Sequence, residues 1–203
     1  RNRVTTARAR AWAHRQPAGE QPPFPEIAEA LSAVTDEEIA ADSFQRQATR
    51  EGKKAQDIAM GVIENCGFVM LQKNAKVPRA GVQYNFKVED GAGGEWWIDV
   101  SGAFTTVRPG LLRIDTIWKT LGRASVLKAY DPAAKILILT SHLPRSGSEG
   151  DKAMRAVSPF TIFDAIPMFD DEAQERLRSY AAGGATVPLP GFWKSTEIVN
   201  GLA

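Results

Sequence analysis

The chain has 203 residues, of which 43% are apolar and 24% charged, with a formal net charge of +1. This length allows one domain with a sizeable core, and five Trp and nine Phe argue against wholesale disorder. The single cysteine excludes an internal disulfide, and no apolar run approaches the roughly 18 residues of a membrane span. We therefore expect a cytoplasmic protein with no membrane partner.

The N-terminal part of the chain is basic and then helical. The first fifteen residues hold five Arg and no acid, and a Pro-rich break follows at 21–25. Thr35 and Glu38 form a capping box, which signals a helix start. We predict a basic arm and linker over 1–25 and a helical preface over 26–50. They precede a core over 51–180 and a C-terminal tail over 181–203.

The clearest amphipathic helix is predicted over 52–68. Ile58, Val62, Ile63 and Cys66 recur at helical spacing, and Gly67 supplies a stop signal. A short strand, FVMLQ, and a turn, VPRAG, are expected to follow. This part of the chain therefore reads as a helix that leads directly into a sheet.

An antiparallel hairpin is predicted over 80–103. In its first strand Val82, Tyr84, Phe86 and Val88 alternate with polar residues, so these four should share one face. The turn-rich stretch EDGAGG follows, and EWWIDVSGAF returns as the second strand. Two strands joined by so short a connection must be antiparallel.

The remaining pattern alternates helices and strands. A helix is predicted over 113–130. The stretch 135–144 is an apolar run followed by turn chemistry, which predicts a strand buried on both faces. A short helix, a short strand within FTIFDAIPM and a last helix over 170–182 follow, and the tail 183–203 is expected to be loop-like. The fold class is therefore α/β (or α+β), with a mixed β-sheet, a central antiparallel hairpin and flanking helices.

Common catalytic and cofactor motifs are absent from the sequence. It contains neither a Walker loop nor a GxGxxG phosphate fingerprint after a strand. One cysteine and two histidines, His14 and His142, are too few for an ordinary structural zinc site. The chemistry must therefore be sought in the hairpin.

Polar residues of the hairpin offer the groups that a metal-dependent hydrolysis needs. Alternate residues of a strand share a face, so Asp99 lies with Ser101, and Asn85 lies with Lys87. A carboxylate beside amide, hydroxyl and ammonium groups can hold a divalent cation and an attacking water. The alternative is a solvated hairpin edge with ordinary polar residues.

The stretch from Gly52 to Leu143 resembles the core of the PD-(D/E)XK nuclease superfamily, the fold of many restriction endonucleases. Tyr84-Asn85-Phe86 stands where that family has its first Asp, and Ile98-Asp99-Val100-Ser101-Gly102 where it has hydrophobic-(D/E)-x-K-G. The helix 52–68, the helix WKTLGRASVLK and the strand ILILT fall in the matching places. The resemblance implies a restriction-endonuclease-like core. It also implies Mg²⁺- or Mn²⁺-dependent cleavage of DNA, as in a restriction or defence system.

The sequence departs from the family pattern at three of the four site positions. Gln56, Asn85 and Ser101 replace the helix Glu, the first Asp and the Lys, and only Asp99 keeps the family's chemistry. Two readings stay open. Either Asp99, Asn85 and Gln56 ligate the metal in an altered active site, or the domain keeps the fold only to bind nucleic acid or a partner subunit.

In the active version, the missing ammonium and negative charge must come from elsewhere. Lys87, or else Ser101, would orient the attacking water, while Glu95 or Asp57 would add negative charge. Both versions also need contacts to phosphates, for which the basic stretch 105–128 offers side chains. The residues expected at DNA phosphates are Arg108, Arg113, Lys119, Arg123 and, in a second loop, Arg145. The expected partner is DNA, with a homodimer or a partner subunit as further expectations.

Overall fold

The computed structural model describes residues 54–101 and 110–201, without the side chains of 200 and 201. The chain divides into two units after Thr49, and every described residue belongs to the second unit, Arg50–Ala203. The basic arm, the helical preface and Arg108 lie outside the described residues. The domain boundaries inferred from the sequence therefore stay predictions.

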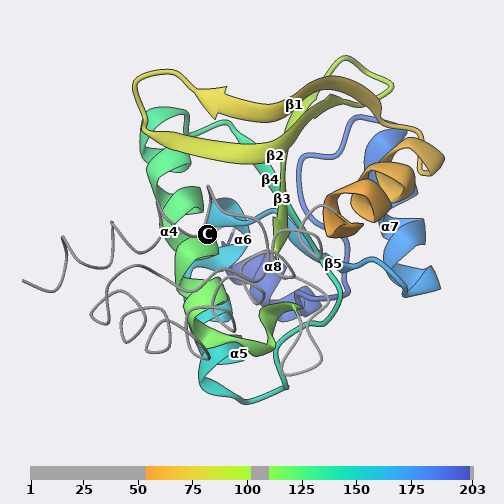
Figure 1. The fold of residues 1–203 in the computed structure, drawn as a ribbon. Coiled ribbons are helices and arrows are strands. Elements are labelled where there is room, and N and C mark those ends of the chain that lie inside the picture. Colours follow the sequence, from red (N-terminus) through yellow and green to blue (C-terminus); the bar gives the residue numbers. More distant parts are fainter. Residues whose placement is uncertain (1–53, 102–109, 202–203) are drawn as a thin grey trace, which may run out of the picture. The chain divides into compact units, whose positions relative to one another are not determined.

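A five-stranded mixed sheet forms the centre of the second unit (Figure 1). The strands lie side by side in chain order, with the first three antiparallel and the last three parallel to one another. The predicted mixed sheet with a central hairpin is therefore confirmed. The strands are β1 (Val69–Val77), β2 (Val82–Glu89), β3 (Glu95–Ser101), β4 (Lys135–Thr140) and β5 (Asp164–Pro167).

Helices cover both faces of this sheet. A helix over 54–65 and α7 (Asp171–Ala181) lie on one face, and α4 (Ile114–Tyr130) lies on the other (Figure 1). The predicted α/β class with flanking helices is thus confirmed. The remaining described helices are η1 (Gly110–Leu112), α5 (Glu149–Ala156), α6 (Ser158–Thr161) and α8 (Ser195–Gly201).

The apolar core has two halves, one on each face of the sheet, and strand β4 contributes side chains to both. Leu137 and Leu139 pack with the helix 54–65 and α7, whereas Ile136 and Ile138 pack with α4. All four are at most 1% exposed, as expected for a strand that is buried on both faces. Each such side chain contributes about 1.5–3 kcal/mol through its burial, so β4 anchors both helical layers to the sheet.

The turn of the hairpin is held by the buried side chain of Asp90. Its carboxylate accepts hydrogen bonds from the backbone N–H groups of Ala92 (3.0 Å) and Gly94 (2.8 Å) and from the indole of Trp96 (2.8 Å). Burial would raise the pKa of Asp90, but these donors outweigh it and lower that pKa. The turn is therefore fixed by side-chain chemistry as well as by its glycines.

The first hairpin strand does not keep all its apolar residues on one face, contrary to the alternating pattern. Phe86 and Val88 pack against the helix 54–65 and α7, whereas Tyr84 packs on the α4 side with Trp97. The registered pairing of β2 with β3 ends at Phe86 opposite Ile98, while β2 continues to pair with β1. Tyr84 thus lies beyond the last registered pair of β2 with β3 and joins the apolar cluster on the α4 side.

The tail is more ordered than the sequence suggested. The expectation of a loop over 183–203 was wrong, because α8 begins at Ser195 and both Phe192 and Trp193 are buried. The indole N–H of Trp193 donates to the carbonyl oxygen of Phe163 at 3.0 Å. A helix of seven residues shows little periodicity, and its stability comes from packing on distant parts of the chain.

Candidate functional site

Strand β3 directs Asp99 and Ser101 toward helix α4, where they meet Thr120. Asp99 is 1% exposed, and one of its carboxylate oxygens lies 2.9 Å from the Thr120 hydroxyl and 3.0 Å from the Ser101 hydroxyl. The two hydroxyl oxygens lie 2.6 Å apart. Each hydroxyl has only one proton, so at most two of these three contacts are hydrogen bonds at any moment.

Arg123, one turn further along α4, neutralises this carboxylate. Its Nη2 atom lies 2.7 Å from Oδ1 and 2.6 Å from Oδ2 of Asp99. The Asp99 side chain is 2% exposed and the Arg123 side chain 36%, so an acid held in the protein interior meets a cation that extends toward solvent. A buried carboxylate without such a partner would be strongly destabilising. The pair therefore ties β3 to α4.

Two polar atoms of this cluster have no partner among the described residues. They are the hydroxyl of Tyr84 and the Nε of Arg123, both buried. Burial, and then the negative charge of Asp99, raise the pKa of Tyr84, so its hydroxyl stays protonated and able to donate. Buried polar groups almost always find a partner, so this side of the cluster could accept a water molecule or a polar ligand group.

Asn85 and Lys87 do not join Asp99 as the sequence pattern suggested. The amide oxygen of Asn85 accepts the backbone N–H of Val100 at 2.7 Å, just past the last registered pair of β2 with β3. Lys87 lies opposite Trp97, and its ammonium group forms an ion pair with Glu95 at 2.7 Å. Residues on the same face of two neighbouring strands do not have to contact one another. Here Lys87 and Asn85 have nearer partners than Asp99.

Gln56 lies on a helix that packs against the other face of the sheet. Ala59 and Ile63 of this helix join the cluster of Phe86 and Ile98, whereas Asp99 faces α4. The helix that carries Gln56, and with it Asp57, is therefore separated from Asp99 by the sheet itself. The predicted ligand set of Asp99, Asn85 and Gln56 is not brought together.

The geometry around Asp99 does not fit a divalent cation. The described residues contain no group of three His, Cys, Asp or Glu side chains placed to hold a metal. Mg²⁺ and Mn²⁺ require several oxygen ligands, and the oxygens of Asp99 are already contacted by Arg123, Thr120 and Ser101. A metal ion could reach this carboxylate only if Arg123 moved away.

The predicted phosphate-binding residues fall into different groups. Arg113 contacts Asp115 through two nitrogens, each at 3.1 Å, and Arg123 is occupied by Asp99. Lys119 and Arg145 are exposed, and neither forms an ion pair within residues 54–101 and 110–201. Lys119 and Arg145 are thus the members of the set with charge available for a ligand.

Thr120 is a member of the site that the sequence analysis did not single out. It lies within the buried stripe of α4 that includes Ile117, Leu121 and Ala124. A polar residue inside an apolar helix face was the available signal, because such a hydroxyl needs an internal partner. Arg123 follows it by three residues, which places both side chains on neighbouring positions of the helix.

A second buried carboxylate lies on the opposite face of the sheet. Asp164 is fully buried, and it accepts hydrogen bonds from its neighbour's backbone N–H (Ala165, 2.8 Å), from Arg176 (3.1 Å) and from the Tyr180 hydroxyl (3.0 Å). Tyr180 in turn accepts the N–H of Leu189 at 2.9 Å. Burial raises the pKa of Asp164 to about 6, even though Arg176 opposes the shift. This cluster joins β5, α7 and the tail.

Comparison of the chain with protein-family models, curated proteins and solved structures finds no match. In the part of the chain that the structure describes, none of the helices combines the length and apolar character needed to cross a membrane. Functional inference therefore depends on the geometry described above.

Proposed function

We propose that this chain is a nucleic-acid-binding module with a nuclease-like order of elements, in which Asp99 has a structural role. One observation carries the proposal: Arg123 neutralises the carboxylate of Asp99, while Lys119 on the same helix stays exposed without an ion-pair partner among the described residues. The charge that α4 offers to a ligand is therefore positive. Phosphate groups supply the matching negative charge.

The surface next to these cations has features that suit a nucleic acid. Trp118, which precedes Lys119, is 60% exposed, and an exposed indole can stack on an unpaired base. A cavity of about 410 Å³ lies between the first turns of α4 and the start of α5. Its wall is mostly apolar, and its polar lining residues are Arg145, Ser148 and the acid Glu149. Lys119 and Arg145 could contact phosphates, and Trp118 could stack on a base. These features therefore suit a nucleic acid with accessible bases.

The test measures binding of labelled double-stranded and single-stranded oligonucleotides by fluorescence anisotropy at several salt concentrations. Lys119→Ala combined with Arg145→Ala should weaken the binding of both kinds of oligonucleotide by about tenfold. It should also reduce the magnitude of the slope of log K against log salt by about two. Trp118→Ala should weaken the binding of the single strand by about 1–3 kcal/mol per stacked base and leave the binding of the duplex nearly unchanged.

Lys76→Ala, which removes an exposed lysine of β1, is the matched control and should bind as the wild type does. The proposal fails if the wild type shows no salt-dependent binding. It also fails if the double variant binds as tightly as the Lys76→Ala control. A protein partner would then be the better explanation for the exposed Trp118.

A metal-dependent nuclease is the second candidate. The Tyr84 hydroxyl and the Arg123 Nε, both buried beside Asp99 without a partner among the described residues, are donors that would hold a phosphate oxygen rather than ligate the cation. This function requires Arg123 to leave the carboxylate before a cation binds. Plasmid is incubated with Mg²⁺ or Mn²⁺ and with either the wild type or Asp99→Asn, which keeps the side-chain shape. A nuclease predicts cleavage that falls by about 100-fold or more in the variant. The first proposal predicts no difference between the two proteins.

A further inference from the structure

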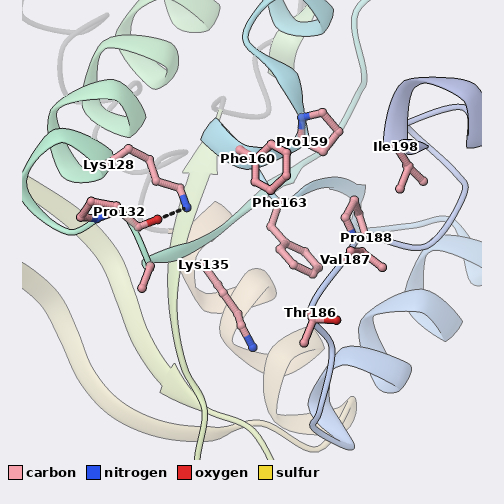
Figure 2. A pocket seen from close by; sticks show the side chains of 11 residues that line it. Lys128, Pro132, Lys135, Pro159, Phe160, Phe163, Thr186, Val187, Pro188 and Ile198 are labelled. Carbon is pink, nitrogen blue, oxygen red and sulfur yellow. Dashed lines mark hydrogen bonds between the residues drawn. The ribbon is translucent and has the colours of Figure 1, made fainter. Parts of the chain in front are cut away.

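A second pocket lies at the other end of the sheet from Asp99 (Figure 2). Lys135, at the start of β4, pairs with Trp96 at the start of β3, whereas Asp99 and Ser101 lie at the end of that strand. The end of α4, the residues before β4, α6, the segment 186–188 and α8 line the pocket, whose volume is about 160 Å³. It is therefore separate from the site described above.

The wall of this pocket is apolar and partly aromatic. Phe163 and Ile198 are 7% and 8% exposed, and Phe160 at 51% and Val187 at 37% remain open to solvent beside them. Figure 2 shows Phe160 and Phe163 facing the space between Lys128 and the segment that carries Val187. Covering these rings with an apolar group would remove hydrocarbon surface from water, which is favourable.

Two lysines bring positive charge to this apolar wall. The ammonium group of Lys128 donates to the carbonyl oxygen of Pro132 at 3.0 Å, which uses one of its three protons. The ammonium group of Lys135 lies 4.6 Å from the ring centroid of Trp96. Neither lysine forms an ion pair within 4 Å among the described residues, although the charge of Lys135 helps to lower the pKa of Asp90. Burial lowers the pKa of Lys128, and the charge of Asp131 opposes this shift.

From this juxtaposition we infer that the pocket binds a small aromatic monocarboxylate. The positive charges of Lys128 and Lys135, which lie on different sides of the pocket (Figure 2), favour an anion, and the wall of Phe160, Phe163 and Val187 selects a flat apolar body over a fully hydrated ion. A cavity of roughly 150 Å³ holds a benzene ring, so a volume of about 160 Å³ suits one ring, with its carboxylate at the open mouth of the pocket. The inference is independent of the proposed nucleic-acid binding.

Benzoate is the probe, with benzyl alcohol, benzylamine and inorganic phosphate as comparisons, and binding is followed by ¹⁵N NMR of the full chain. Benzoate should bind with a Kd on the order of 1 mM, and the other three compounds about tenfold more weakly or not at all. Lys128→Met and Lys135→Met should each weaken benzoate about fivefold. Lys76→Met, a lysine exposed on β1, should leave its affinity unchanged.

Val187→Trp provides a second variant, because this exposed residue can fill the mouth of the pocket without removing any core side chain. It should abolish benzoate binding while the melting temperature stays near that of the wild type. Three results would overturn the inference. They are no benzoate binding at about 20 mM, equal affinity for benzyl alcohol, or lysine variants that bind like Lys76→Met.

Discussion

The two faces of the sheet each hold a buried aspartate paired with an arginine, and the two pairs differ in how completely they are enclosed. Asp164 is fully buried, and the Arg176 side chain beside it is 14% exposed. A Cβ atom at Gly191 would overlap the guanidinium group of Arg176, so the tail packs directly over this pair. On the other face the Arg123 side chain is 36% exposed.

The hydrogen bonds around Asp164 are also more complete than those around Asp99. No buried polar side-chain atom around Asp164 lacks a partner among the described residues, and Tyr180 connects the carboxylate to the backbone of Leu189. Around Asp99, the hydroxyl of Tyr84 and the Nε of Arg123 have none among the described residues. The Asp164 pair is therefore closed within the fold, whereas the Asp99 pair leaves two buried donors that a water molecule or a polar group could satisfy.

Removal of the arginine should produce the largest effects and should separate the two pairs. Arg176→Met leaves Asp164 without a cation in a fully buried position, so the free energy of unfolding at pH 7 should fall by about 4 kcal/mol. Arg123→Met leaves Asp99 with two hydroxyl donors and removes a side chain that is 36% exposed, so a smaller loss of about 2 kcal/mol is expected. Urea unfolding measures both losses, and equal losses would contradict the distinction.

The pH dependence of stability should come from the closed pair. The pKa of Asp164 is about 6 in the folded protein against 3.8 for a free side chain, so folding takes up a proton between these values. Stability is therefore highest below pH 3.8 for this group and falls as the pH rises through 6, by on the order of 3 kcal/mol in total.

Asp164→Asn removes this titration and isolates it from that of other groups. The difference in unfolding free energy between wild type and variant, measured in urea at pH 4 and pH 7, should shift by roughly 2 kcal/mol toward the variant at the higher pH, because part of the total effect is already lost at pH 4. A difference that does not change with pH would mean that Asp164 is charged at no cost in the folded protein.

The two tyrosines should show the smallest and most contrasting effects. Tyr180→Phe removes a hydroxyl that donates to Asp164 and accepts from Leu189, so a loss of about 2 kcal/mol is expected. Tyr84→Phe removes a hydroxyl that has no partner among the described residues, so its effect on stability should be close to zero. A loss above about 1 kcal/mol for Tyr84→Phe would instead reveal a bound water or ligand group there.

The candidate site was only partly within reach of sequence reasoning. Asp99 and Ser101 were correctly placed on one face, because strand alternation is a local property. Lys87 was assigned to Asp99 on the same rule, but it lies opposite Trp97 and is held by Glu95. Strand alternation predicts the face on which a side chain lies. It does not predict which neighbour a long side chain such as Lys87 contacts.

The sequence by itself determined the mixed α/β class, the hairpin, the buried strand β4 and the amphipathic helices, since each depends on periodicity and turn residues within a short window. Only the tertiary structure decided that Asp99 meets Arg123, 24 positions away, and that Gln56 lies across the sheet. The packing of helices on a sheet depends on the whole core, so no local pattern encodes which polar side chains it brings together. The same reason explains why Tyr84 left the face of Phe86 and why the tail became part of the fold.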